Sequence, residues 1–206
     1  MALATRKPTR IQAKNRAIIE RAALEIFSRD GFRGATVDAI AEAAGMSKPN
    51  LLYYFPTKDD IYRSLLESQL QNWLGPLLEL DPTGEPTEQI AAYIERKIEL
   101  ARDFPMESRL FANEMIRGAP ILKDVLAGDL KRLVDEKADV IKGWMDDGRL
   151  QPTDPHHLIF AIWATTQHYA DFDVQVRAIL DRDSDDRFGD AAATLQQIFL
   201  NGLKPR

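Results

Sequence analysis

Apolar residues recur at helical spacing along this chain, and glycine and proline interrupt the pattern at intervals. One stripe at i, i+4, i+7 and i+8 consists of Ile19, Ala23, Ile26 and Phe27, and it ends at Gly31. No segment alternates apolar and polar residues as a half-buried strand would. The sequence therefore predicts an all-α protein of about nine helices, with no internal repeat.

Capping and breaking residues predict where these helices begin and end. In the first third of the chain, Thr36 caps a short helix, Ser47 opens a second, and the Thr57…Asp60 spacing resembles a capping box for a long one. Further on, Thr87 is the expected cap of the next helix. That helix should end at Pro105, and the helix after it should end before Gly118. Three more helices are expected over about 121–147, 155–180 and 187–201.

Charge is distributed unevenly along the chain. Residues 1–64 carry a net charge of +4 and the remainder −9, within a total of −5. The first 16 residues contain five basic side chains and no acidic one. This asymmetry suits a basic reader of phosphates joined to an acidic module with another task, although an ordinary solvated tail would also produce it.

Two short helices around the turn AAGMSK (residues 43–48) have the pattern of a helix-turn-helix. Gly45 stands where the turn needs a left-handed residue. Residues 39, 40, 43, 51 and 52 are apolar and would hold the two helices together. The second helix would then present Ser47, Lys48, Asn50 and Tyr53 outward, which are side chains suited to base edges and phosphates.

These residues belong to a longer pattern: AA at 22–23, F at 27, GF at 31–32, TV at 36–37, IA at 40–41, AAGMSK at 43–48 and YYFPTK at 53–58. The chain thereby resembles the TetR family of transcription regulators over about residues 17–64. The resemblance implies a basic arm (1–16), a DNA-binding domain (17–64) and an effector-binding and dimerisation domain (65–206). It implies a homodimer on double-stranded operator DNA, with a small-molecule effector. One departure is Leu52, where many members carry tyrosine, so the choice between Tyr53 and Tyr54 as the DNA contact stays open.

The same resemblance assigns roles in the DNA-binding domain. Thr36, Tyr53 and Lys58 would grip phosphates, and Lys48 and Asn50 would face bases. Thr36 and Lys58 stand at predicted helix starts, where backbone N–H groups also favour an anion. A role at the edge of the core is the alternative for both tyrosines.

The second domain contains one distinctive run, HLIFAIWATTQHYADF at residues 157–172. On a helix, Phe160, either Trp163 or Ala164, Gln167 and Asp171 share one face, so an amide and a carboxylate lie on a face that is otherwise aromatic. A buried glutamine needs hydrogen-bond partners, which either neighbouring helices or a ligand must supply.

Beyond the family pattern, the chain resembles regulators of pyrimidine utilisation within this family. The matching stretches are residues 50–56, 73–77, 128–131, 135–137 and 157–172. That resemblance implies uracil or thymine as the effector, whose binding would release the operator. Trp73, Trp163, Gln167, Tyr169 and Asp171 form the expected ligand set, because a flat ring with C=O and N–H groups can stack on aromatics and pair with an amide. Simple core packing is the alternative for either tryptophan.

Two further features concern signalling and assembly. Pro76 is expected to bend the long helix that links the two domains, close to Trp73. An apolar stripe on the last helix predicts a dimer interface. Two copies of this helix and of the long helix before it would form a four-helix bundle across a two-fold axis. The members of the stripe are Ala191, Leu195, Ile198 and Phe199.

Other classes of protein compete with this interpretation. An enzyme would have to use His156, His157 or His168, but no metal site with a third ligand is evident, so neither catalysis nor a cofactor is expected. The chain has no cysteine, which excludes disulfides and zinc–thiolate sites. With no apolar run of about 20 residues and no signal peptide, a cytoplasmic protein without a membrane partner is expected. A regulator of amphipathic drugs or lipid-like metabolites remains the main alternative.

Overall fold

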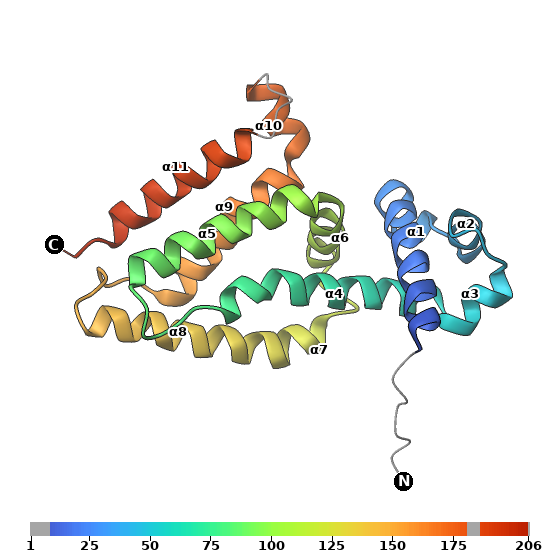
Figure 1. Ribbon diagram of the computed structural model, residues 1–206, viewed down its shortest axis with the longest axis horizontal. Helices are drawn as coiled ribbons and strands as arrows, with labels where there is room; N and C mark the ends of the chain where they lie inside the picture. Colours follow the sequence, from blue (N-terminus) through green and yellow to red (C-terminus); the bar gives the residue numbers. More distant parts are fainter. Residues whose placement is uncertain (1–8, 181–185, 206) are drawn as a thin grey trace, which may run out of the picture. The chain divides into compact units, whose positions relative to one another are not determined.

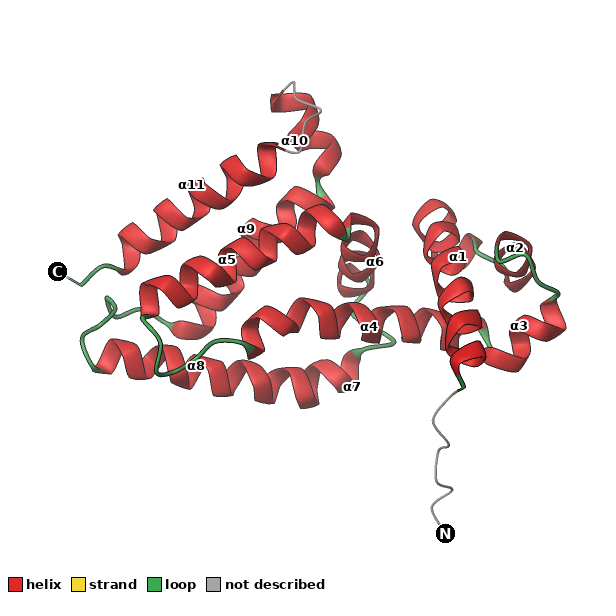
Figure 2. Cartoon of the chain, viewed as in Figure 1, coloured by secondary structure: helices red, strands yellow, loops and turns green. Residues whose placement is uncertain are grey.

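The computed structural model describes residues 9–180 and 186–205, and this part of the chain is helical without a strand (Figure 2). The chain divides after Ser68 into two compact units. The N-terminal unit contains α1 (Arg10–Gly34), α2 (Val37–Ala43), α3 (Lys48–Tyr54) and the start of α4 (Lys58–Leu78). The C-terminal unit contains the rest of α4, α5 (Pro86–Asp103), α6 (Pro105–Ile116), α7 (Lys123–Val125), the π-helical turn η1 (Leu126–Leu130), α8 (Lys131–Asp146), α9 (Pro155–Asp171), α10 (Asp173–Leu180) and α11 (Asp186–Leu203).

Local side-chain chemistry sets the ends of the first helices. The Thr36 hydroxyl accepts the Ala39 N–H at 3.1 Å, and the Ser47 hydroxyl accepts the Asn50 N–H at 3.4 Å. Gly45 between them has a φ of 66°, which confirms the predicted left-handed turn. Thr57 and Asp60 form the expected reciprocal cap at the start of α4.

Helix α1 begins earlier than the sequence pattern indicated. Thr9 and Gln12 form a capping box, so Arg10 to Arg16 lie in α1 rather than in a free arm. Residues 1–8 of the expected arm lie outside the described residues. At the other end, Gly31 takes a left-handed φ of 69° where the first helix was expected to stop, and helical hydrogen bonding resumes to Gly34.

The N-terminal unit has its own core. Phe27 meets Tyr62 edge-on with ring centroids 5.1 Å apart, and Phe32 lies 4.7 Å from the same ring. Ile40 of α2 and Leu51 of α3 are fully buried. The two short helices pack against α1 and against each other, which leaves the outer face of α3 exposed.

In the C-terminal unit, α5 is the central helix and packs against both α9 and α11 (Figure 1). Helix α8 packs on the other side of α9. The core between these helices is apolar, with Tyr93, Trp144 and Phe188 as its buried aromatic residues. None of the described helices is long and apolar enough to cross a membrane.

Three helix boundaries differ from the sequence-based expectation. Helix α5 starts at Pro86 with Glu85 as the cap, because proline suits the first helical position, so Thr87 lies inside the helix. The helix expected over 155–180 breaks at Phe172 into α9 and α10. Within the expected helix 121–147, η1 inserts a π-helical turn. Counting α7, η1 and α8 as one continuous helix, the described residues form ten helices, close to the nine expected.

Candidate functional site

Helix α3 presents its polar side chains to solvent. Ser47, Lys48 and Asn50 are exposed at its N-terminal end, and the Tyr53 side chain is 70% exposed one turn later. Lys48 donates a 2.9 Å hydrogen bond to Asp38 of α2, and both side chains are largely in water. Such an exposed ion pair is weak, so Lys48 is available to exchange its partner for DNA.

The two tyrosines of α3 differ in their surroundings. The Tyr54 hydroxyl accepts a 2.7 Å hydrogen bond from Asn15 of α1, whereas the Tyr53 hydroxyl accepts a longer bond of 3.3 Å from Gln12. Arg16 donates to the Tyr54 carbonyl and lies 3.9 Å from the Phe55 ring. Tyr54 and Arg16 are thus engaged in holding α3 to α1, which favours Tyr53 as the DNA contact.

Lys58 is engaged inside the N-terminal unit. Its ammonium donates to the carbonyls of Phe32 and Ala35 at 2.7 and 2.8 Å and lies over the Phe32 ring. A phosphate would compete with two backbone acceptors for this group. The structure thus gives Lys58 a structural function, and its phosphate contact stays a prediction.

A cavity of about 220 Å³ lies within the C-terminal unit, and we call it the effector cavity. It brings together three of the five predicted ligand residues, which are Trp73, Trp163 and Gln167. Its other lining residues are Leu70, Leu74, Lys97, Phe111, Met115, Leu126 and Leu130. Its walls therefore come from α4, α5, α6, η1 and α9.

Gln167 is the polar group that projects from α9 into this apolar site. Gln167 is half-buried, and no hydrogen bond joins its amide to another described residue, so neighbouring helices leave the amide open to a ligand. Gln167 also lines a wider hollow of about 490 Å³ together with Asn113 and Asp171. Its amide is therefore placed to bind a ligand that enters either space.

Asp171 lies beside the effector cavity rather than in its wall. Its carboxylate accepts a 2.5 Å hydrogen bond from the Ser108 hydroxyl, and it lines the wider hollow. Burial raises its pKa, and Ser108, Arg109, His168 and Lys97 act in the opposite direction.

Tyr169 points elsewhere. It lines a separate hollow with Asp103 and Phe188 and packs against the core. It follows Gln167 by two residues, which places it about 200° around the helix at ~100° per residue. Tyr169 therefore does not line the effector cavity, and its contact with a ligand stays a prediction.

Lys97 was missed by the sequence analysis although it lies in the cavity wall. It is 2% exposed, and its ammonium lies 3.7 Å from the centre of the Trp73 ring. Burial lowers its pKa well below the usual lysine range. A signal was present, because Lys97 occupies the same helix face as the apolar residues Ile90, Ile94 and Ala101.

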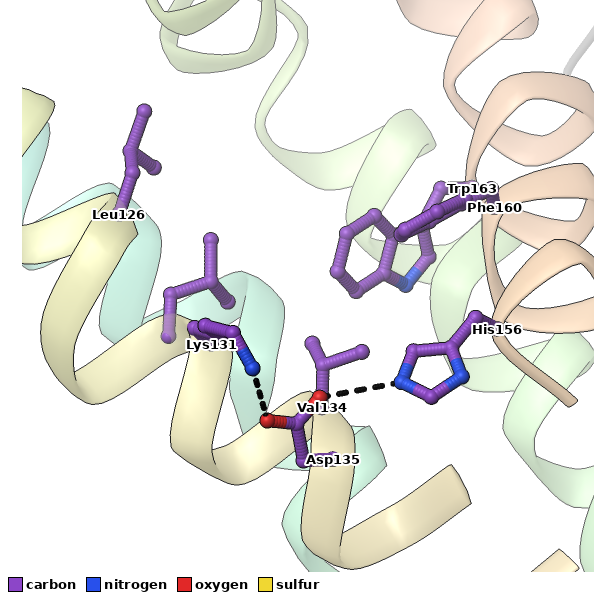
Figure 3. A pocket seen from close by; sticks show the side chains of 8 residues that line it. Leu126, Lys131, Val134, Asp135, His156, Phe160 and Trp163 are labelled. Carbon is purple, nitrogen blue, oxygen red and sulfur yellow. Dashed lines mark hydrogen bonds and ion pairs between the residues drawn. The ribbon is translucent and has the colours of Figure 1, made fainter.

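Another hollow, of about 430 Å³, is lined by residues of η1, α8 and α9, with Trp163 among them (Figure 3). At its edge, Asp135 accepts hydrogen bonds from Lys131 and, at 3.1 Å, from His156. Leu126, Leu130 and Trp163 line both this hollow and the effector cavity. Among the described residues, no group of three or more His, Asp or Glu side chains is arranged to hold a metal ion.

The predicted dimer residues divide into two groups. Ala191 and Leu195 are 3% and 6% exposed and lie in the protomer's own core, because their face of α11 packs on α5. Phe199 is half-buried against the same core, whereas the Ile198 side chain is 61% exposed. Of the four, Ile198 is the residue available to a partner.

Comparison with known proteins identifies the family. Residues 19–65 match the family model "Bacterial regulatory proteins, tetR family", and residues 66–206 match "YcdC-like protein, C-terminal region" of the TetR type. The chain belongs to the TetR family and is a DNA-binding transcription regulator, not an enzyme.

The HTH-type transcriptional regulator RutR of Escherichia coli (strain K12) is 48% identical over 198 residues, which cover 95% of this chain and 93% of RutR. The RutR of Shigella flexneri matches to the same extent. Among solved structures, a tetR-family regulatory protein from Rhodococcus RHA1 superposes with a TM-score of 0.74 at 18% identity, covering 94% of this chain and 98% of its own. AibR in complex with isovaleryl coenzyme A and operator DNA gives 0.68 at 17% identity, covering 90% and 97%. These last two likenesses confirm the all-helical fold.

Proposed function

We propose that this regulator is a homodimer that binds a palindromic operator and leaves it when uracil or thymine occupies the effector cavity. The observation that carries the proposal is the half-buried Gln167 amide, which forms no hydrogen bond with another described residue and lines a cavity with Trp73, Trp163 and Phe111. A pyrimidine ring offers both requirements of such a site: a flat face to stack and an edge of C=O and N–H groups.

The size of the cavity supports a small ligand. Sites for drug-sized molecules usually occupy about 300–1,000 Å³. The effector cavity by itself has about 220 Å³, which suits one small ring, whereas the hollows that share its lining residues have about 430 and 490 Å³.

The route from ligand to DNA runs along α4. This helix begins at Lys58 in the N-terminal unit, and its residues Leu70, Trp73 and Leu74 line the effector cavity. Pro76 lies two residues before the end of α4, and proline disturbs the helical turn that precedes it, so the expected bend falls on the turn that contains Trp73 and Leu74. A ligand that binds better to one setting of α4 shifts the population of DNA-competent dimers, whose recognition helices need a spacing of about 34–36 Å or a multiple of it. A regulator of this kind acts in the cytoplasm, where the chromosome lies.

Calorimetry together with operator release tests the proposal. The operator is first obtained by selecting bound duplexes from a random pool, and uracil, thymine, cytosine and adenine are then titrated. Uracil and thymine should bind and release the duplex, while adenine should bind worse because its second ring needs more volume. If neither pyrimidine produces heat or releases the duplex, the effector assignment is overturned and the regulator assignment stands.

A variant pair then tests the residue. Gln167→Leu should weaken uracil binding by roughly 1–3 kcal/mol, because the polar edge of the ligand loses its partner. Gln71→Leu, at an exposed position of the same unit on α4, is the control and should bind uracil like the wild type. Equal binding by Gln167→Leu would leave uracil as the effector but remove Gln167 from the site.

A further inference from the structure

Lys97 carries a buried amino group for which none of the described residues supplies a hydrogen-bond acceptor. Helix α5 carries it on its buried face, where it is 2% exposed. An ammonium has three N–H donors, yet none of the described residues accepts a hydrogen bond from this one. Its protein contacts are the Trp73 ring at 3.7 Å and the charge of Asp171.

A second buried lysine of the C-terminal unit, Lys137, does have a hydrogen-bond acceptor and serves as a comparison. Lys137 of α8 is 8% exposed, and its ammonium donates to the Leu80 carbonyl at 3.3 Å. Lys137 does not line the effector cavity, whereas Lys97 does. A cation–π contact alone compensates only part of the cost of removing an ammonium from water. Lys97 therefore lacks a hydrogen-bond acceptor, which an oxygen atom of a ligand in the cavity would provide.

We propose that Lys97 donates a hydrogen bond to the 4-carbonyl oxygen of the effector ring and thereby selects uracil and thymine over cytosine. The inference rests on the proposed function, since it assigns a role within the same cavity. Lys97 and Gln167 both line this space, from α5 and α9 respectively, so two different polar groups can read one ring.

The selectivity follows from the chemistry at the 4-position of the ring. Uracil and thymine carry a carbonyl oxygen there, whereas cytosine carries an amino group. The charged form of Lys97, which a ligand oxygen favours, would meet the amino group of cytosine donor against donor and would stay without an acceptor. A site built to hydrogen-bond one group rejects an analogue that lacks it, so cytosine should bind about 10- to 100-fold more weakly than uracil.

A matched pair of lysine variants tests the inference by calorimetry. Lys97→Met keeps a long unbranched side chain but removes the donor, so it should bind uracil at least about tenfold more weakly than wild type and lose the preference over cytosine. Lys137→Met removes the other buried lysine and should keep both the wild-type affinity and the preference. Circular dichroism establishes that each variant is folded.

Two measurements on the wild-type chain keep the test independent of the variants. Replacing the 4-oxygen by sulfur, a poorer acceptor, should weaken binding, so 4-thiouracil should bind less tightly than uracil. Uracil binding should also take up protons, because burial lowers the pKa of Lys97 in the free protein and a ligand oxygen favours its charged form. Titrations in buffers of different ionisation enthalpy measure that uptake, and Lys97→Met should abolish it.

The outcomes separate this inference from the proposed function. If uracil binds wild type and Lys97→Met equally well, or cytosine and 4-thiouracil bind as tightly as uracil, the role of Lys97 is overturned while the pyrimidine effector stands. If neither uracil nor thymine binds the wild-type chain, the proposed effector is overturned and this role falls with it.

Discussion

The indole Nε1 of Trp163 donates a 2.6 Å hydrogen bond to the hydroxyl of Tyr93, which comes from a different helix, α5. Tyr93 is buried in the core, and its burial raises its pKa, so the hydroxyl stays protonated. Trp163 forms a wall shared by the effector cavity and the hollow lined by η1, α8 and α9. The bond therefore sets the orientation of the aromatic surface on which we propose that the effector stacks.

Tyr93→Phe removes the acceptor and keeps the ring. The indole N–H then loses its partner, and we expect the free energy of unfolding to fall by roughly 1–3 kcal/mol. Uracil binding should weaken as well, because the indole is no longer held in one orientation. Urea unfolding and calorimetry measure the two effects. Unchanged values in both would mean that the bond neither stabilises the core nor orients Trp163.

Lys48→Ala tests the DNA-reading surface. Removing the exposed ammonium of α3 should weaken operator binding, and the slope of log affinity against log salt should become shallower by about one unit if Lys48 neutralises one phosphate. Lys142→Ala is the control, since it removes the same charge from an exposed ion pair with Asp146 in the C-terminal unit. Fluorescence anisotropy with the selected operator gives both quantities. Wild-type affinity in Lys48→Ala would show that α3 is not the recognition helix as assigned.

The helix-turn-helix was predictable because its determinants are local. Thr36, Gly45 and Ser47 act within three or four residues of their own positions, so a linear sequence contains the whole signal. Trp163 and Gln167 were found for a similar reason, because helical periodicity places them on one face of α9.

The rest of the site depends on contacts between distant residues. Tyr93 and Trp163 lie 70 residues apart, and no local pattern pairs them. Lys97 occupies a core position on α5, but the cavity beside it exists only once α4, α6 and α9 surround it. The break at Phe172 has no glycine or proline to announce it. Helical spacing grouped Asp171 with Gln167, whereas Tyr169 entered the expected ligand set only with the resemblance to regulators of pyrimidine utilisation.

Two carboxylates at the ends of α9 predict opposite responses to pH. Burial raises the pKa of Asp171, so the folded state holds this proton more tightly than the unfolded state does. The wild-type chain should therefore gain stability relative to Asp171→Asn as pH falls from the raised pKa to about 4, the ordinary aspartate value.

Asp154 provides the control at the other end of the helix. It accepts the His157 N–H as the cap of α9, which lowers its pKa. Its stabilisation is present above about pH 4 and is lost as pH falls through the lowered pKa, so wild type should lose stability relative to Asp154→Asn over that range. Urea unfolding from pH 3 to pH 8 measures both differences, and slopes of the same sign would contradict the assigned surroundings of Asp171.

The position of Ile198 gives the cleanest test of the dimer. Wild type should sediment as a dimer at micromolar concentration. The Ile198 side chain is 61% exposed in the protomer, so Ile198→Glu should leave the protomer folded. If it meets its counterpart across a two-fold axis, the new charge is buried without a partner, which costs on the order of 3 kcal/mol and raises the dimer dissociation constant about a hundredfold.

Leu195→Glu should behave differently, although it lies on the same helix. Leu195 is 6% exposed in the core against α5, so a charge there should unfold the protomer rather than release an intact monomer. Gln71→Glu adds the same charge at an exposed position on α4 and should remain a dimer. Sedimentation velocity and circular dichroism on the three variants separate loss of assembly from loss of folding. A wild-type monomer would overturn the dimer itself, whereas a folded, dimeric Ile198→Glu would place the interface elsewhere on the C-terminal unit.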